Sequence, residues 1–93
     1  MDIDLYIDKI EFLIKQMESS EPELRLINFA TCVVLLDRIQ IIQPENSYIG
    51  EKIVQILDLL ERICGLANGG RYIANDTSEA LFKLEDLKKD FLS

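Results

Sequence analysis

Apolar side chains near the start of the chain recur every three or four residues. Ile3, Ile7, Ile10, Ile14 and Met17 follow this spacing. Because an α-helix has 3.6 residues per turn, these positions fall on one face. The pattern predicts a helix over residues 2–18 that buries a single stripe against the rest of the protein.

The next segment, residues 21–42, is apolar in nearly every direction around a helix axis. Ser20, with Glu23 three residues later, matches a capping box, and Pro44 ends the segment. Its apolar residues are Leu24, Ile27, Ala30, Val33, Val34, Leu36, Ile39 and Ile41. A helix without a polar face is typical of a buried position. We therefore expect this second helix at the centre of the fold.

Turn residues predict two further helices. The third is expected over residues 48–67, ended by the glycine stop at 68–70. Asp76 is a candidate N-cap for the fourth, over residues 77–92, and segment 71–75 fits either a loop or one helical turn. Short connections favour antiparallel neighbours. The expected fold class is all-α, a four-helix bundle or related compact helical array that forms a single domain over the whole chain.

Charge narrows the range of partners. The chain has 93 residues and a net charge of −7. Phosphate backbones and anionic membranes repel such a surface, so we expect neither nucleic acid nor a membrane as a partner. A basic protein is the partner that this charge attracts, and solubility alone is the other interpretation. The first residues lack the basic and apolar pattern of a secretory signal, so a cytoplasmic location is expected.

The residues that usually carry chemistry are scarce. The chain has no histidine, which removes the commonest general base and most zinc sites. Cys32 and Cys64 lie among apolar residues and are interpreted as buried, reduced packing thiols. Residues 68–71 resemble an anion-binding loop but lack the Lys-Ser/Thr ending of a phosphate loop. We expect no enzyme activity, no metal and no cofactor.

Four acidic residues define a stripe on the first predicted helix. Asp4, Asp8, Glu11 and Glu18 fall within about 80° when each residue turns the helix by about 100°. One interpretation is an ordinary solvated face. The other is an acidic ridge that docks Lys and Arg side chains of a partner protein.

Apolar residues beside these acids are the remaining candidates for partner binding. Leu5 and Phe12 lie beyond the acidic stripe, where packing under another helix is favoured and an exposed anchor is the alternative. Phe82 lies opposite the core stripe of the last helix, near Asp86. It either packs against segment 71–75 or is exposed, and an exposed aromatic side chain within a polar rim is typical of binding interfaces.

Two arginines interrupt the apolar second helix. Arg25 and Arg38 are expected to bond to carboxylates at the edge of the bundle.

A small, acidic, histidine-free helical chain with aromatic residues among carboxylates resembles the bacterial toxin-immunity proteins. These are the cognate inhibitors of bacteriocins and of contact-dependent growth-inhibition toxins. The resemblance covers size, charge and fold class over the whole chain. The tyrosines are dispersed, so the chain departs from the Tyr-Tyr-Pro signature of colicin nuclease immunity proteins. The resemblance implies tight binding to a basic nuclease domain.

The sequence leaves three hypotheses. The first is a non-enzymatic inhibitor that covers the active site of a basic toxin with acids that mimic phosphate. The second is a self-associating structural or scaffolding module, because an all-apolar helix needs covering on every side. The third is a small enzyme or ligand carrier with a polar-lined cavity, which no run of inward polar residues favours.

Overall fold

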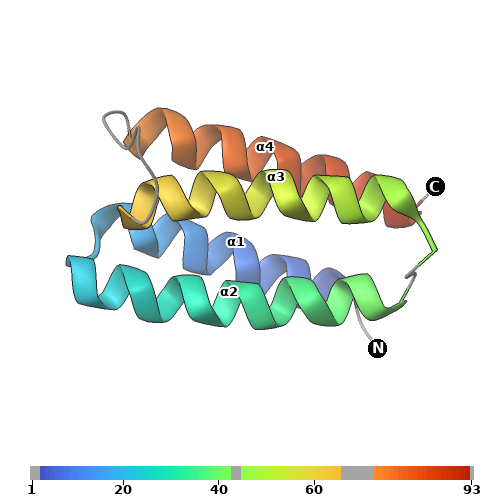
Figure 1. Ribbon diagram of the computed structural model, residues 1–93, viewed down its shortest axis with the longest axis horizontal. Helices are drawn as coiled ribbons and strands as arrows, with labels where there is room; N and C mark the ends of the chain where they lie inside the picture. Colours follow the sequence, from blue (N-terminus) through green and yellow to red (C-terminus); the bar gives the residue numbers. More distant parts are fainter. Residues whose placement is uncertain (1–2, 43–44, 66–72, 93) are drawn as a thin grey trace.

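Four α-helices form an up-and-down bundle in the computed structural model (Figure 1). The structure describes residues 3–42, 45–65 and 73–92. The helices are α1 (Ile3–Ser19), α2 (Pro22–Ile42), α3 (Ser47–Cys64) and α4 (Ile73–Leu92). Each helix runs antiparallel to the preceding one, and α4 returns beside α1 to close a ring of four. The predicted all-α four-helix bundle is confirmed. None of the described helices is long and apolar enough to cross a bilayer.

The hydrophobic core lies inside this ring, and the four helices contribute different numbers of buried side chains to it. The stripe predicted on α1 is confirmed, since Ile7, Ile10, Ile14 and Met17 are all buried. The α3 helix contributes the most buried side chains, and on its opposite arc Glu51, Gln55, Asp58 and Arg62 are exposed. The buried residues of α3 are Ile49, Ile53, Ile56, Leu59, Leu60 and Ile63. Ala80, Leu84 and Leu87 of α4 complete that side of the core.

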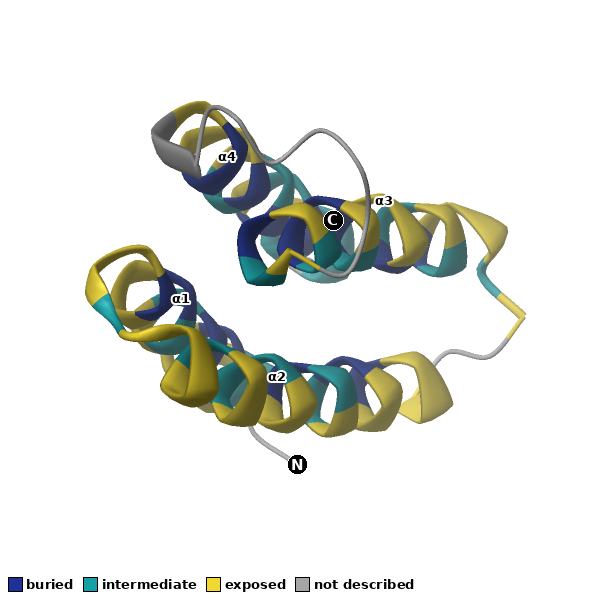
Figure 2. Cartoon of the chain, turned by 60° about the vertical axis from the view of Figure 1, so that its left-hand side comes forward, coloured by how far each residue is buried: buried dark blue, intermediate teal, exposed yellow. Residues whose placement is uncertain are grey.

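The prediction that the second helix is central is wrong. The α2 helix contacts α1 and α3 but not α4, and it buries only Cys32, Leu36 and Ile39. Figure 2 shows exposed residues along most of its length. A ring of four helices has no central member, because each helix turns one arc inward. A helix that is apolar all round can bury one arc against the core, and the apolar residues of its other arcs then remain exposed to solvent.

The turn between α1 and α2 is held by side chains that bond to the last carbonyls of α1. The α2 helix begins at Pro22, so Ser20 is not its N-cap and the predicted capping box is wrong. The Ser20 hydroxyl instead donates to the Gln16 carbonyl. Arg25 of α2 donates its Nε to the Met17 carbonyl at 2.8 Å and its Nη2 to the Glu18 carbonyl at 3.2 Å. A cation at the negative end of a helix dipole is stabilising.

The expected pairing of both arginines with carboxylates is therefore wrong. Arg25 bonds to backbone carbonyls instead, because the end of α1 lies beside the first turn of α2. Arg38 is exposed, and it forms no ion pair within the described parts of the chain.

The α3 helix ends earlier than predicted. Its N-cap is Asn46, whose side chain accepts from the Tyr48 amide at 3.1 Å and the Ile49 amide at 3.4 Å. Its C-cap is Gly65, with a left-handed φ of 79°, so the predicted end at residue 67 is wrong. Residues 68–70, the predicted stop, lie outside the described residues.

The α4 helix begins earlier than predicted, so Asp76 lies in its first turn and is not an N-cap. The Asp76 side chain is almost buried, and its Oδ1 lies 3.9 Å from Nη1 of Arg62 on α3. The acid therefore faces a neighbouring helix, a role that local sequence spacing could not indicate.

Candidate protein-binding surface

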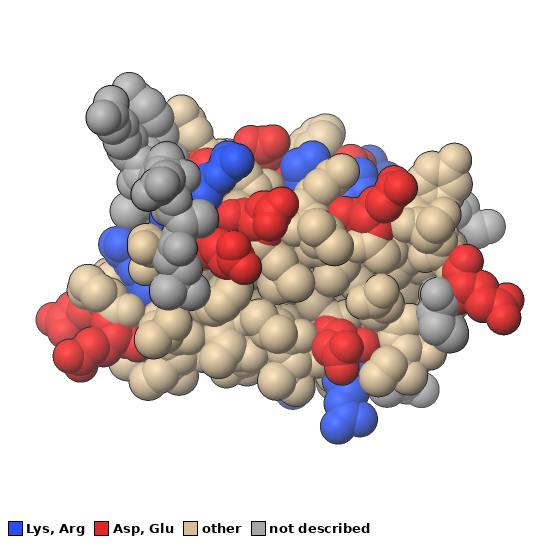
Figure 3. All heavy atoms as spheres, viewed as in Figure 1, with Lys and Arg blue, Asp and Glu red and all other residues tan. Residues whose placement is uncertain are grey.

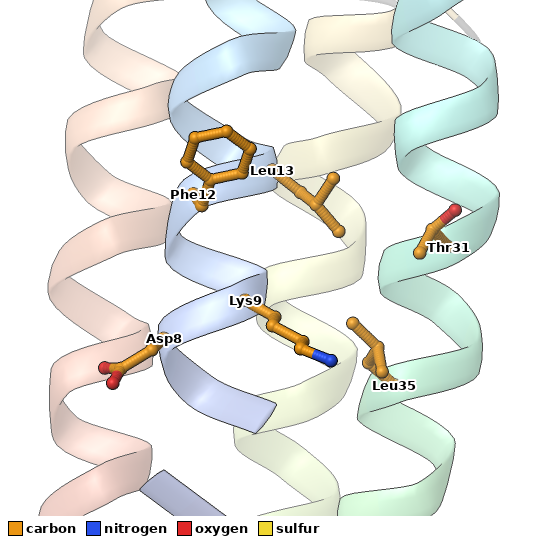
Figure 4. A pocket seen from close by; sticks show the side chains of 6 residues that line it. All are labelled: Asp8, Lys9, Phe12, Leu13, Thr31 and Leu35. Atoms are coloured by element: carbon orange, nitrogen blue, oxygen red, sulfur yellow. The ribbon is translucent and has the colours of Figure 1, made fainter. Parts of the chain in front are cut away.

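The acidic residues of α1 lie together on one side of that helix. Asp4, Asp8 and Glu18 are exposed and Glu11 is half-buried. Figure 4 shows the Asp8 carboxylate directed away from α2, on the side of α1 that leads to α4. Lys15 stands within the stripe, with its Nζ 3.4 Å from Oε1 of Glu11. Since this pair is exposed, it neutralises one acid without removing the negative character of the stripe.

Two large apolar side chains stand beside the acids. Leu5 is 51% exposed and Phe12 is 60% exposed, so the favoured interpretation of internal packing is wrong. The physical reason is the ring arrangement. With α2 and α4 on its two sides and the core beneath, α1 has no helix over its outer arc, where both residues lie.

A shallow groove runs between α1 and α2 next to Phe12. Its volume is about 460 Å³, and it is lined by Asp8, Lys9, Phe12, Leu13, Thr31 and Leu35. Figure 4 shows Leu13 and Lys9 extending from α1 toward α2, while Leu35 and Thr31 line the opposite wall. The lining is mostly apolar, with Lys9 and Asp8 as its charged groups. Such a groove accepts an apolar side chain more readily than a charged substrate.

Phe82 is the most exposed of the apolar α4 residues whose side chains the structure describes. It is 69% exposed, as the second interpretation of this residue predicted. Residues 71–72 of the segment expected to cover it lie outside the described residues. Phe82 and Phe12 each lie near the middle of their helices, and α4 lies beside α1. The outer surface of this helix pair therefore carries two exposed aromatic rings.

Asp86 lies one turn after Phe82 on α4, away from the candidates on α1. Its Oδ2 is 3.7 Å from Nζ of Lys52 on α3, so this carboxylate belongs to the α3–α4 side of the molecule. The structure thus brings together Asp4, Leu5, Asp8, Glu11, Phe12 and Glu18 on α1, and it places Phe82 and Asp86 one turn apart on the neighbouring α4.

Burial governs the chemistry of the two thiols. Cys32 is fully buried, and burial, with a smaller contribution from the nearby Cys64, raises its pKa to about 12. Burial also raises the pKa of Cys64, although Arg25 acts in the opposite direction. Neither thiol is thereby activated as a nucleophile. Within the described residues, no group of three or more metal-ligating side chains is placed to hold an ion.

One surface was missed in the sequence. The outer arc of α2 exposes Ile27, Val34 and Ile41. The signal was the uninterrupted apolar character of that segment, which was interpreted as burial.

No protein-family model, curated protein or solved structure matches this chain.

Proposed function

We propose that this chain is a non-enzymatic binding protein whose α1–α4 surface docks onto a basic protein and inhibits it. The observation that carries the proposal is the exposure of Phe12 and Phe82 on neighbouring helices, beside the acidic stripe of α1. Exposed aromatic side chains cost solvation free energy in the free protein and recover it when a partner covers them. Interfaces concentrate their binding energy in such residues and surround them with polar groups.

The acidic stripe supplies the second requirement, which is selection of the partner. Asp4, Asp8 and Glu18 are exposed, and the net charge of the chain is −7. Complementary charge speeds the encounter with a basic surface and repels acidic competitors. A row of carboxylates also resembles a phosphate backbone in charge. We therefore propose a toxin nuclease as the inhibited partner, in keeping with the resemblance to toxin-immunity proteins, and the cytoplasm as the place of inhibition.

The partner can be identified with a photo-reactive benzoylphenylalanine at position 12 or 82 of the chain, expressed in its host cell. We expect both positions to crosslink to one basic protein, because α1 and α4 are neighbouring helices. The same residue at position 54 is the control, since Val54 is 57% exposed on the outer arc of α3. Crosslinks that are equally frequent from position 54, or partners that are acidic, would contradict the proposal.

The captured partner then allows a kinetic test of the stripe. Asp4→Lys/Asp8→Lys should lower the association rate constant about tenfold at low salt and flatten its salt dependence. Glu51→Lys/Asp58→Lys on the outer arc of α3 makes the same change in net charge and should have a much smaller effect. Phe12→Ala and Phe82→Ala should raise the dissociation rate about tenfold instead. One equivalent of the unmodified chain should abolish the partner's catalytic activity, and an active complex would exclude the inhibitor function.

A further inference from the structure

The outer face of α2 is an apolar surface that none of the other described helices covers. Ile27, Val34 and Ile41 are exposed, together with Ala30 between them. The other outer arc of that layer, on α3, is mainly polar, with Val54 as its exposed aliphatic residue. In Figure 3 the lower band of the surface, which follows α2, is mostly uncharged, with acidic groups at one end and one adjoining red and blue group farther along. The face is apolar from Ile27 to Val34, and the exposed Asp37 and Arg38 lie between Val34 and Ile41. Exposed apolar surface of this kind marks an interaction site.

We propose that this face joins two copies of the chain, with their α2 helices packed antiparallel about a two-fold axis at Ala30 and Thr31. The reason is a palindromic spacing. Ile27 and Val34 lie one helical turn from that centre in opposite directions, and Glu23 and Arg38 lie two turns from it. A two-fold axis places each residue opposite the one at the same distance on the other side. Ile27 of one copy thus meets Val34 of the other.

The charges favour a second copy in this antiparallel arrangement. Glu23 of one copy lies at the height of Arg38 of the other, and symmetry provides this pair twice. Both side chains are exposed, and neither forms an ion pair within the described parts of the chain. A parallel arrangement would place Glu23 against Glu23 and Arg38 against Arg38, which is repulsive. The pairing of Glu23 with Arg38 therefore favours the antiparallel arrangement over the parallel one.

The centre of the face is suited to close approach of two helices. Ala30 has the smallest side chain of the face, so two backbones can approach where they cross. The Thr31 hydroxyl already donates to the Ile27 carbonyl at 3.1 Å. Covering Thr31 with a second helix therefore leaves no hydroxyl donor without a partner, and its methyl group is available for packing.

The area of the outer α2 face limits how tightly two copies can bind. A surface one helix wide, about 10 Å by 30 Å, offers roughly 300 Å² in projection. Each partner of a standard stable interface buries about 800 Å². We therefore expect a reversible dimer with a dissociation constant on the order of micromolar or weaker. The interface lies on a different helix from Phe12 and Phe82, so it does not depend on the proposed function.

Sedimentation equilibrium of the purified chain, from about 10 µM to about 1 mM at low salt, tests the dimer. We expect the mass to rise from monomer toward dimer. Val34→Asp should abolish the rise, because it places two carboxylates in the apolar centre. Val54→Asp is the matched control, since Val34 and Val54 are 56% and 57% exposed on adjacent helices. It should leave the dimer intact, and circular dichroism should show that both variants retain their helices.

Charge exchange tests the antiparallel register. Glu23→Arg and Arg38→Glu should each weaken the dimer about tenfold, because each replaces two attractive pairs by two repulsive pairs. The double variant restores both pairs and should return the dissociation constant to within about threefold of the unmodified chain. A monomer at every concentration overturns the proposal. An assembly larger than a dimer, or a dimer that Val34→Asp does not weaken, also overturns it. A double variant that dimerises no more tightly than either single variant would contradict the antiparallel register.

Discussion

Among the described residues, the buried thiol of Cys32 is the group whose pKa the fold raises most. Its side chain has no exposed surface, and burial favours the neutral form over the thiolate. Cys64 is half-buried, and its Sγ donates to the Arg25 carbonyl at 3.4 Å. The interpretation of both cysteines as free packing thiols therefore holds fully for Cys32, and Cys64 adds a hydrogen bond to the turn of α2.

The raised pKa of Cys32 makes stability depend on pH in the alkaline range. The pKa rises from 9.0 to about 12 in the folded chain, so the unfolded chain releases a proton above pH 9 that the folded chain keeps. The free energy of unfolding should be unaffected by this group below pH 9. It should fall between about pH 9 and pH 12, by at most about 1.4 kcal/mol per pH unit.

Urea unfolding at a series of pH values measures this slope. Cys32→Ala is the comparison, because lysine and tyrosine titration is common to both proteins. The variant should be less stable at neutral pH, since it leaves a cavity, but its stability should fall less steeply above pH 9. Parallel curves would show that Cys32 does not titrate differently in the folded and unfolded chains.

Helix ends in this bundle are determined partly by local residues and partly by neighbouring helices. Asn46 and Gly65 act locally, because one accepts from the first amides of α3 and the other has a left-handed backbone. Arg25 acts across a turn on the carbonyls of α1. The first kind of signal is present in the sequence, although Gly65 was passed over for the glycines that follow it. The second kind exists only when the two helices lie together.

The two described glycines of α3 should respond in opposite ways to alanine. Gly65→Ala places a Cβ at a φ of 79° and should lower the free energy of unfolding by about 1 kcal/mol. Gly50→Ala lies inside the helix, where a Cβ would meet only the amide nitrogen of the Gln40 side chain at 3.3 Å. That flexible end can move aside, so the gain in helix propensity should raise the free energy of unfolding by about 0.5 kcal/mol.

Thermal unfolding of the two variants, side by side, measures both effects. Because the substitution is chemically the same, the difference between them reports backbone conformation together with the Gln40 contact at position 50. A loss of stability in Gly50→Ala would mean that the Gln40 side chain is held more rigidly than its exposed position indicates.

Over the whole molecule, like charges repel more than the observed ion pairs compensate. The described residues form three ion pairs, with at least one partner of each partly exposed to solvent, against a net charge of −7. Exposed pairs contribute little to stability because water and salt screen them. Compactness of the bundle therefore works against electrostatic repulsion, and the acidic stripe of α1 is one concentrated source of it.

Salt should consequently stabilise the fold. Raising NaCl from about 10 mM to about 150 mM should increase the free energy of unfolding by about 1 kcal/mol, measured in urea because urea is uncharged. Asp4→Asn/Asp8→Asn, which changes the net charge from −7 to −5, should show a smaller increase. A decrease in stability with salt would mean that attractive ion pairs outweigh the repulsion.

The sequence by itself determined where the helices lie and which arcs of α1 and α3 are buried. Residues such as Ile10 and Ile56 recur at helical spacing against a polar opposite face, so one orientation buries the apolar stripe and every other exposes it. It also placed Asp4, Asp8 and Glu18 on one arc, because that depends only on the helical period.

Only the tertiary structure decided which arc of α2 faces inward and which side chains remain outside. On a helix that is apolar all round, turning inward the arc with Leu36 or the arc with Val34 buries similar local surface. The choice depends on how Cys32, Leu36 and Ile39 fit between α1 and α3. Exposure of Phe12 and Phe82 was decided in the same way, because it follows from which helices lie beside α1 and α4, a relation between distant segments that local spacing does not contain.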